Sequence, residues 1–221
     1  QVGYGLLDEM TEAWEQKEKT ENPMKTILLG PSWQADNIMD SCIDELIEEF
    51  SKLDCRVIIR PHPQYVRLYG DKIEALRLRY ADKFGEKLEL QTDFSSTDTV
   101  YNADLLVTDW SNVGYEFALS TGKPVLYINT PMKVMNPQYK DISVEPFDIR
   151  IRAQLGGELE LTELNRAGDV ARELLSDPEK FRETIFAVKK ENIYNLGHGA
   201  EAAGRYLVRR IETINARRAG K

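Results

Sequence analysis

Short apolar runs alternate with longer amphipathic stretches along most of the chain. The apolar runs lie at 26–32, 55–63, 87–92, 103–110 and 123–130. Most of them are nearly continuous in apolar residues, which is typical of strands buried on both faces of a parallel sheet. The stretches between them repeat apolar residues at helical spacing. The pattern therefore predicts an α/β fold, a Rossmann-like parallel sheet with helices on both faces.

Amphipathic helices are predicted between and after these strands. Asp36 stands where an N-cap would open the first of them, over 37–53. The alternation of apolar runs and amphipathic stretches is absent over 131–157, for which we expect a long loop with at most a short strand or helical turn. The other helices are expected at about 71–84, 96–102, 111–122, 162–175, 178–191 and 199–217.

The first 25 residues differ from the rest of the chain. They are rich in Glu and Lys and end in "ENP", so we interpret 1–25 as a linker helix rather than part of a core. Residues 26–221 are expected to form one domain, because a chain of 221 residues can bury about 70% of its unfolded surface. The chain begins at Gln1 rather than Met, which indicates a piece of a longer protein.

Charge and composition exclude several classes of protein. A formal net charge of −8 argues against broad nucleic-acid affinity, which needs a concentrated basic surface, although a local basic pocket is compatible with it. No apolar run approaches the roughly 18 to 20 residues of a membrane span. Cys42 and Cys55 show no CxxC spacing and have no histidine cluster nearby, so we expect core thiols and no metal site. These features predict a cytoplasmic protein.

The sheet topology indicates where chemistry can occur. Ligands of an open parallel sheet bind beyond the carboxyl ends of the strands, where the strand order reverses. With the usual order 3-2-1-4-5, the turn at Gly30 would face the turn at Ser111. The helix that starts there offers unpaired N–H groups to a phosphate. The alternative is that Asp109 or Ser111 simply caps this helix. The chain has no GxGxxG motif and no P-loop lysine, so a nicotinamide or P-loop site has little support.

The stretch "RPHP" (60–63) closes the second strand and is the more unusual signal. It contains His62, one of two histidines in the chain, between two prolines that stiffen the backbone. His62 can act as a general base or donate to a phosphate oxygen, and Arg60 can bind phosphate in bidentate fashion. A purely structural role for the histidine is the alternative.

Two further candidates lie later in the chain. Glu116 is about one and a half turns into the predicted helix after Ser111, close enough to its start to reach a sugar hydroxyl, with a surface salt bridge as the alternative. His198 precedes the last predicted helix within "NLGHGAEAAG". We expect the neighbouring glycines to shape that turn, with a second phosphate or ribose contact as its possible function.

Several stretches together resemble a known family. "GYGLLDEM", "RPHP", "ADLLVTDWSNVGYEFA" with "GKPVLYIN", and the late glycine-rich turn are similar to the C-terminal half of the CDP-glycerol glycerophosphotransferases, enzymes that prime or polymerise teichoic acid. The resemblance runs over nearly the whole chain, and the "TDYSS" turn of the family corresponds to 108–112. It implies a GT-B architecture of two Rossmann-like domains. This chain would be the donor-binding half, joined through 1–25 to a missing N-terminal domain.

The resemblance also implies an activity, the transfer of a phosphoalditol from CDP-glycerol to a cell-wall or surface polymer with release of CMP. His62 is the expected catalytic residue. No cofactor, metal or nucleic acid is expected, and a polymer or lipid-linked acceptor would bind through the missing domain. Membrane attachment, peripheral and at the inner face of the cell membrane, would occur only through the full-length protein. Nucleotide and diphosphate contacts are expected from Gly30, Ser32, Arg60, Thr108, Asp109, Ser111, Asn112, Glu116 and His198.

The chain departs from the family pattern at several of these positions. Asn112 replaces a second serine, Trp110 a tyrosine, Glu116 the usual aspartate, and His198 an aspartate that commonly precedes glycine. The stretch after the fifth strand also lacks the acidic-tyrosine pattern of the family. CDP-ribitol or a nucleotide sugar is therefore an alternative donor. A GT-B glycosyltransferase, a UDP-sugar 2-epimerase-like domain and a non-catalytic binding domain are the alternative functions.

Overall fold

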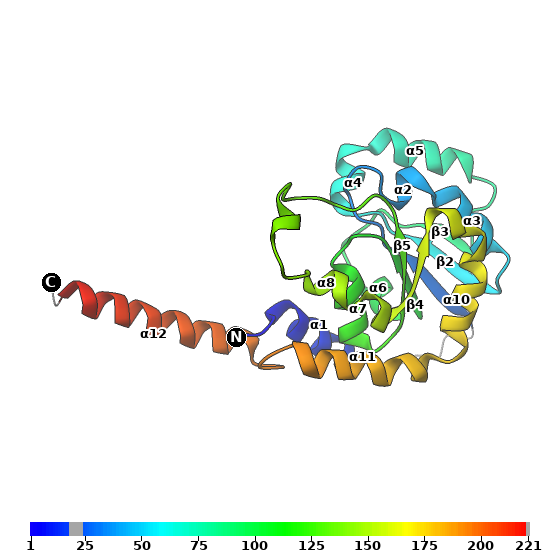
Figure 1. Cartoon of the computed structure of the whole chain (residues 1–221). Helices are drawn as coiled ribbons and strands as arrows, with labels where there is room; N and C mark the ends of the chain where they lie inside the picture. The colour runs from blue at the N-terminus through cyan, green and yellow to red at the C-terminus, as the bar shows by residue number, and fades with distance from the viewer. Residues whose placement is uncertain (18–23, 220–221) are drawn as a thin grey trace.

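The computed structural model describes residues 1–17 and 24–219, which contain a six-stranded parallel sheet in the order β3-β2-β1-β4-β5-β6 (Figure 1). The first five strands have the predicted order 3-2-1-4-5, so the predicted Rossmann-like α/β fold is confirmed. The strands are β1 (Lys25–Leu29), β2 (Cys55–Ile59), β3 (Leu88–Leu90), β4 (Leu105–Thr108), β5 (Val125–Asn129) and β6 (Gly156–Glu160).

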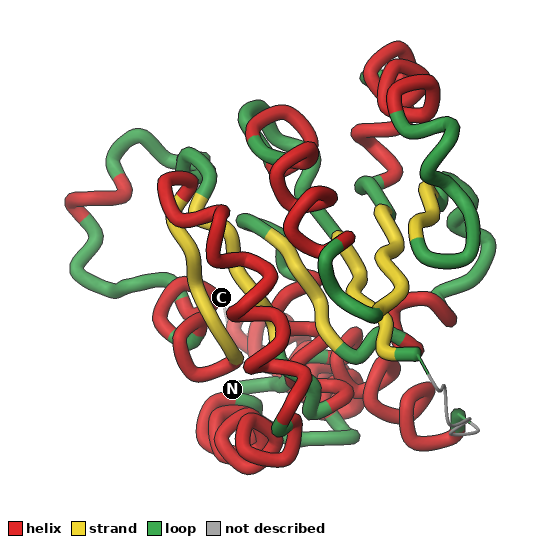
Figure 2. Tube along the Cα trace, turned by 90° about the vertical axis from the view of Figure 1, so that its right-hand side faces the viewer, coloured by secondary structure: helices red, strands yellow, loops and turns green. Residues whose placement is uncertain are grey.

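Helices cover both faces of the sheet (Figure 2). Successive strand residues point to opposite faces, so Ile27 and Leu29 pack in one core cluster, while Leu28 packs in a second cluster on the other face of the sheet. The helices are α1 (Gly5–Gln16), α2 (Ile38–Ser41), α3 (Ile43–Ser51), α4 (Pro63–Leu68), α5 (Gly70–Arg79), α6 (Asp98–Asn102), α7 (Val113–Thr121), α8 (Phe147–Arg150), α9 (Arg152–Leu155), α10 (Ala167–Ser176), α11 (Pro178–Asn192) and α12 (Gly199–Ala219), with 3-10 turns η1 (Tyr139–Asp141) and η2 (Leu161–Arg166).

The helix predicted over 37–53 begins and continues differently from the prediction. Its N-cap is Asn37, whose side chain accepts a hydrogen bond from the Met39 backbone N–H at 2.7 Å. The predicted cap, Asp36, instead has a φ of 56°, in the left-handed region. The backbone also breaks at Cys42, which separates α2 from α3. The helix expected at about 71–84 is observed as α5, which ends earlier, at Arg79, and the preceding helix α4 was not predicted.

The stretch 131–157, expected to be a loop with at most a short strand or helical turn, contains three short helical segments and leads into β6. This sixth strand pairs in parallel with β5. A Cβ on Gly156 would lie 1.9 Å from the Val125 carbonyl oxygen, so the strand can begin this close to its neighbour only with glycine. Only Leu159 of β6 is buried, which explains why the apolar pattern of the strand is weak.

The two terminal helices differ in how they pack. Within the predicted linker 1–25, α1 packs on α7, and Leu7 is fully buried in the core beside it. A connection of this segment to a further domain stays a prediction, and residues 18–23 lie outside the described part. At the other end, α12 projects away from the domain and buries only Gly199 (Figure 1). Among helices in the described ranges, none has the length and apolar character needed to cross a bilayer.

Candidate nucleotide-binding site

The carboxyl ends of β1 and β4 meet at the point where the strand order reverses. The Gly30 backbone N–H donates to the Val107 carbonyl at 2.8 Å, and the Thr108 hydroxyl donates to the Gly30 carbonyl at 2.6 Å. A Cβ on Gly30 would lie 3.0 Å from Leu106 Cδ1 and 3.9 Å from Val113 Cγ1, at the start of α7. The structure thus brings Gly30, Thr108 and the start of α7 together.

The Asp109 carboxylate ties the two loops of this edge to each other. It is 1% exposed, and its Oδ1 accepts hydrogen bonds from the backbone N–H groups of Ser32 and Trp110, both at 2.8 Å. Its Oδ2 accepts from the Ile38 backbone N–H at 3.1 Å. Three backbone donors from two loops therefore occupy this carboxylate, which stabilises the loops rather than presenting an acidic group to a ligand.

The start of α7 lacks the side-chain cap that the sequence left open as an alternative. Asn112 occupies the N-cap position, and within the described residues no side chain accepts a hydrogen bond there. Ser111 is half-buried and Asn112 is exposed. Because uncapped N–H groups at a helix start carry a partial positive charge, this turn can bind an anion.

Two buried hydroxyls lie at the same edge without partners. Ser32 and Thr130 are 4% and 3% exposed, and neither Oγ of Ser32 nor Oγ1 of Thr130 has a hydrogen-bond partner within the described ranges. Thr130 is adjacent to the turn after β4, because its carbonyl accepts from the Trp110 indole N–H at 2.8 Å. A buried hydroxyl without a partner costs about 1–3 kcal/mol, so such groups favour a ligand that would pair with them.

Arg152 is a buried cation that sequence reasoning did not identify. Its guanidinium carbon lies 4.2 Å from the centre of the Trp110 ring and 4.3 Å from that of Tyr127. It also donates to Asn129 Oδ1 at 2.7 Å, and its Nε lies 3.4 Å from a Glu158 carboxylate oxygen. Burial lowers the pKa of Arg152, an effect that the Glu158 carboxylate opposes. The stacked guanidinium fixes Trp110 and with it the turn after β4.

His62 has both a local structural role and a place at the edge of the sheet. It is the N-cap of α4, and its Nδ1 accepts from the Gln64 backbone N–H at 3.0 Å. Burial, and secondarily the charge of Lys133, lowers the pKa of His62. Because Nδ1 accepts the Gln64 hydrogen bond, the neutral imidazole carries its proton on Nε2.

Arg60, next to His62, is held by the loop that follows β3. Its guanidinium donates to the Gln91 side chain at 2.7 Å and to the Ser96 carbonyl at 2.8 Å, and it lies 5.3 Å from the centre of the Phe94 ring. Burial lowers the pKa of Arg60. Because of its hydrogen bonds, Arg60 anchors the loop after β3 in this structure, and phosphate binding by this residue stays a prediction.

Glu116 and His198 are tied to the N-terminal segment. The Tyr4 hydroxyl donates to a Glu116 carboxylate oxygen, while burial raises the pKa of Glu116.

His198 is exposed, and its Nδ1 lies 3.5 Å from a Glu201 oxygen. The turn around His198 is held by Asp8 of α1, which accepts from the backbone N–H groups of Gly197 and Gly199 at 2.8 and 2.9 Å. His198 itself therefore pairs with Glu201 of α12, and the turn that carries it is held by α1.

No protein-family model and no curated protein sequence matches the chain. Solved structures do match. The wall teichoic acid polymerase TagF has a TM-score of 0.54 and 16% identity over 97% of this chain and 48% of its own. A TagF variant soaked with CDPG has a TM-score of 0.50 and 16% identity over 99% of this chain and 51% of its own. The Methanocaldococcus jannaschii UDP-GlcNAc 2-epimerase, in complex with UDP-GlcNAc and UDP, has a TM-score of 0.55 and 17% identity over 94% of this chain and 54% of its own.

These structures establish the class of fold. Glycosyltransferases are also among the matches, and the chain has the Rossmann-like α/β fold found in the GT-B class. The chain spans about half the length of the structures it matches. Among the residues described, no group of three or more His, Cys, Asp or Glu side chains is placed to hold a metal ion.

Proposed function

We propose that this chain is the donor-binding domain of a transferase that moves a phosphoalditol from CDP-glycerol, or a related CDP-alditol, to a cell-wall or surface polymer with release of CMP. The observation that carries the proposal is the edge of the sheet between β1 and β5. There the uncapped start of α7 shares the edge with the buried, unpartnered hydroxyls of Ser32 and Thr130, whose backbones bond to the turn that precedes α7. A diphosphate would supply the acceptor oxygens for all of these donors.

The choice of donor rests on two likenesses. The turn at 108–112 and the "RPHP" stretch resemble the CDP-glycerol glycerophosphotransferases. Independently, the fold is similar to that of a wall teichoic acid polymerase, one structure of which was obtained with CDPG. The sequence resemblance supports a cytidine donor, and the fold likeness is compatible with it.

The proposed roles follow from the contacts of each residue. Ser111, Asn112 and the first N–H groups of α7 bind the diphosphate, and they stabilise the charge that develops on its oxygens during transfer. Gly30 lets the loop after β1 approach α7, while Thr108 and Asp109 hold the two loops in place.

His62 acts in this proposal as a hydrogen-bond donor to a phosphate oxygen. A general base at Nε2 would need that nitrogen unprotonated, with the proton on Nδ1. Nδ1 already accepts from the Gln64 backbone N–H, so that tautomer would break the cap of α4. From the sequence alone, His62 could act either as a general base or as a hydrogen-bond donor to phosphate. Its N-cap hydrogen bond with Gln64 favours the donor role.

The acceptor and a second domain belong to the proposal as well. The chain spans about half of each structure it matches, so a partner domain would contribute the acceptor site. The alternative donor is a UDP-sugar, which the similarity to a UDP-GlcNAc 2-epimerase supports.

Titration of the protein with CDP-glycerol, CMP and UDP-GlcNAc tests the proposal. We expect both cytidine compounds to bind, and Ser111→Ala to weaken them about tenfold or more, since a hydrogen bond to a charged group is lost. Ser51→Ala is the matched control, because that exposed hydroxyl only donates to the Glu48 carbonyl. Absence of cytidine binding at millimolar concentration would contradict the proposal, and binding of UDP-GlcNAc alone would favour the alternative.

A further inference from the structure

Trp33 is a large aromatic residue that stands exposed at the carboxyl edge of the sheet. It lies in the loop between β1 and α2 and is 43% exposed, whereas its neighbours Pro31 and Ser32 are buried. Indole rings are highly buried on average, so an exposed one beside the polar groups of this edge is a candidate for ligand contact. Sequence reasoning did not select Trp33.

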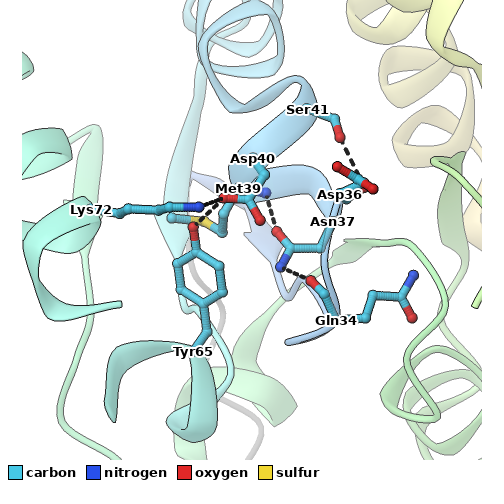
Figure 3. Close-up of polar contacts among 8 residues, drawn as sticks. All are labelled: Gln34, Asp36, Asn37, Met39, Asp40, Ser41, Tyr65 and Lys72. Carbon is cyan, nitrogen blue, oxygen red and sulfur yellow. Dashed lines mark hydrogen bonds and ion pairs between the residues drawn. The ribbon is translucent and has the colours of Figure 1, made fainter. Parts of the chain in front are cut away.

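The loop that carries Trp33 is held by its own hydrogen bonds. The Ser32 backbone N–H is bound by Asp109, and the Asn37 side chain donates to the Gln34 carbonyl at 2.7 Å. Figure 3 shows Asn37 joining Gln34 to Met39, and the Ser41 hydroxyl donating to the Asp36 carbonyl. A ring on such a loop is positioned before a ligand arrives, so binding loses little conformational entropy.

The helices that follow Trp33 and His62 are also tied together. Asp40 of α2 accepts from the Tyr65 hydroxyl of α4 at 2.7 Å and from Lys72 of α5 at 2.6 Å (Figure 3). His62 caps the same α4 helix. The Asp40 carboxylate therefore links α2, which follows the Trp33 loop, to α4, which follows His62.

Three loops place an aromatic ring, an imidazole and an ammonium group side by side. The Trp33 and His62 rings have centroids 6.2 Å apart. Lys133, from the loop after β5, has its Nζ 5.8 Å from the centre of the Trp33 ring. We call Trp33, His62 and Lys133 the Trp33 platform.

The polar groups of the Trp33 platform are hydrogen-bond donors. Lysine has donors and no acceptor, and His62 has only its Nε2 proton to offer because Nδ1 is occupied by Gln64. A pyrimidine edge presents both donors and acceptors, whereas the hydroxyl and phosphate oxygens of a polyol phosphate accept from every donor placed here. The C–H face of a polyol or sugar also packs on an indole ring.

We infer that the Trp33 platform is the subsite for the transferred part of the donor, a phosphoalditol whose carbon chain packs on Trp33 while its oxygens accept from His62 and Lys133. This rests on the proposed function, which places the diphosphate at the start of α7 and the reacting phosphate beside His62. In this arrangement Trp33 determines which transferred group the domain accepts.

Binding of an intact donor compared with its bare nucleotide tests this inference. Wild-type protein, Trp33→Ala and Trp33→Phe are titrated with CDP-glycerol and with CMP, and also with UDP-GlcNAc and UMP. We expect Trp33→Ala to weaken the intact donor about tenfold and the bare nucleotide less than twofold, with Trp33→Phe retaining most of the affinity. Trp14→Phe is the matched control, because Trp14 lies on α1 and its ring packs against Lys123.

The outcomes separate the inference from the function on which it rests. Equal loss of donor and nucleotide in Trp33→Ala would overturn the inference in favour of a nucleobase stacked on Trp33. No loss of either would overturn it outright. In both cases wild-type binding would leave the proposed function standing. If the wild-type protein binds neither cytidine compound, the proposed function itself fails and the inference fails with it.

Discussion

The Asp109 carboxylate binds the backbone of Ser32 across the point where the strand order reverses. The bond is 2.8 Å long, and Asp109 is 1% exposed. A second acidic oxygen of the same side chain holds the Ile38 backbone N–H at the start of α2. One residue of the turn after β4 thereby sets the position of the whole loop after β1, including the exposed Trp33.

Replacement of Asp109 by alanine should destabilise the protein strongly. Three backbone donors would lose their acceptor in a buried place, so we expect the free energy of unfolding to fall by about 2–4 kcal/mol. Chemical denaturation monitored by circular dichroism measures it. Asp54→Ala is the control, because Asp54 forms an exposed ion pair with Lys87 and its loss should leave stability nearly unchanged. Equal stability of the two variants would show that Asp109 does not hold the loops.

Replacement of Arg152 by lysine should loosen the turn after β4. Lysine keeps the charge but loses the planar stack on Trp110 and Tyr127, so we expect a loss of about 2–4 kcal/mol in unfolding free energy and a red shift of Trp110 fluorescence. Arg172→Lys is the control, since Arg172 is exposed and pairs only with Asp169 three residues before it. An unchanged emission maximum in Arg152→Lys would contradict the stacking role.

Glu116 should make stability depend on pH in a defined direction. Burial raises its pKa in the folded state, so between the unfolded and folded pKa values the folded state binds more protons. The stabilisation that Glu116 contributes is therefore fully present at pH values below its pKa in the unfolded chain. It is lost as the pH rises through its pKa in the folded state. Glu116→Gln keeps an acceptor for the Tyr4 hydroxyl and removes the charge. Its thermal stability relative to wild type should therefore improve as pH is raised from about 4 to 7.

The hydrogen bond from the Tyr4 hydroxyl lowers the pKa of Glu116 and so opposes the effect of burial. A variant without this hydroxyl provides a second test. Tyr4→Phe removes the bond, so the titration of Glu116 should move to higher pH. Thermal denaturation of the three proteins across the range measures both effects. A stability difference between wild type and Glu116→Gln that stays flat with pH would refute the assignment.

Most of α12 should be dispensable for folding of the domain. Beyond Gly199 the helix buries no residue, so removal of 205–221 should change the melting temperature by less than about 2 °C. Ile185→Ala in α11 is the contrasting variant, because Ile185 is fully buried and should cost about 2–4 kcal/mol. A large loss of stability on truncation would mean that α12 packs on the domain in solution.

The sequence predicted the sheet because its strands are buried on both faces. Runs such as 55–59 and 125–128 leave little other interpretation, and the strand order followed from the usual topology of such folds. The strand β6 was not predicted specifically, since its pairing depends on a glycine close to Val125 rather than on an apolar run. The cap at Asn37 was misplaced by one residue because Asp36 has an equally good side chain for capping and only the backbone distinguishes them.

Only part of the candidate site could be predicted from the sequence. The turns at Gly30 and Ser111 follow from topology alone, and the structure does bring Gly30 to the start of α7. Arg152 was not predicted, because its partners come from separate strands and the turn after β4. The unpartnered hydroxyls of Ser32 and Thr130 could not be predicted either, since the lack of a partner is a property of packing.

The helices that start at the carboxyl edge differ in one respect that affects the stability of the whole domain. Of the helices that follow β1, β2 and β4, α2 is capped by Asn37 and α4 by His62, whereas α7 has no side-chain cap within the described ranges. Any anion that settles on α7 would complete that helix and would bind the native state in preference to the unfolded chain. The melting temperature should therefore rise with the concentration of the right compound, and a panel of nucleotides could be ranked by that rise without any acceptor or assay of transfer.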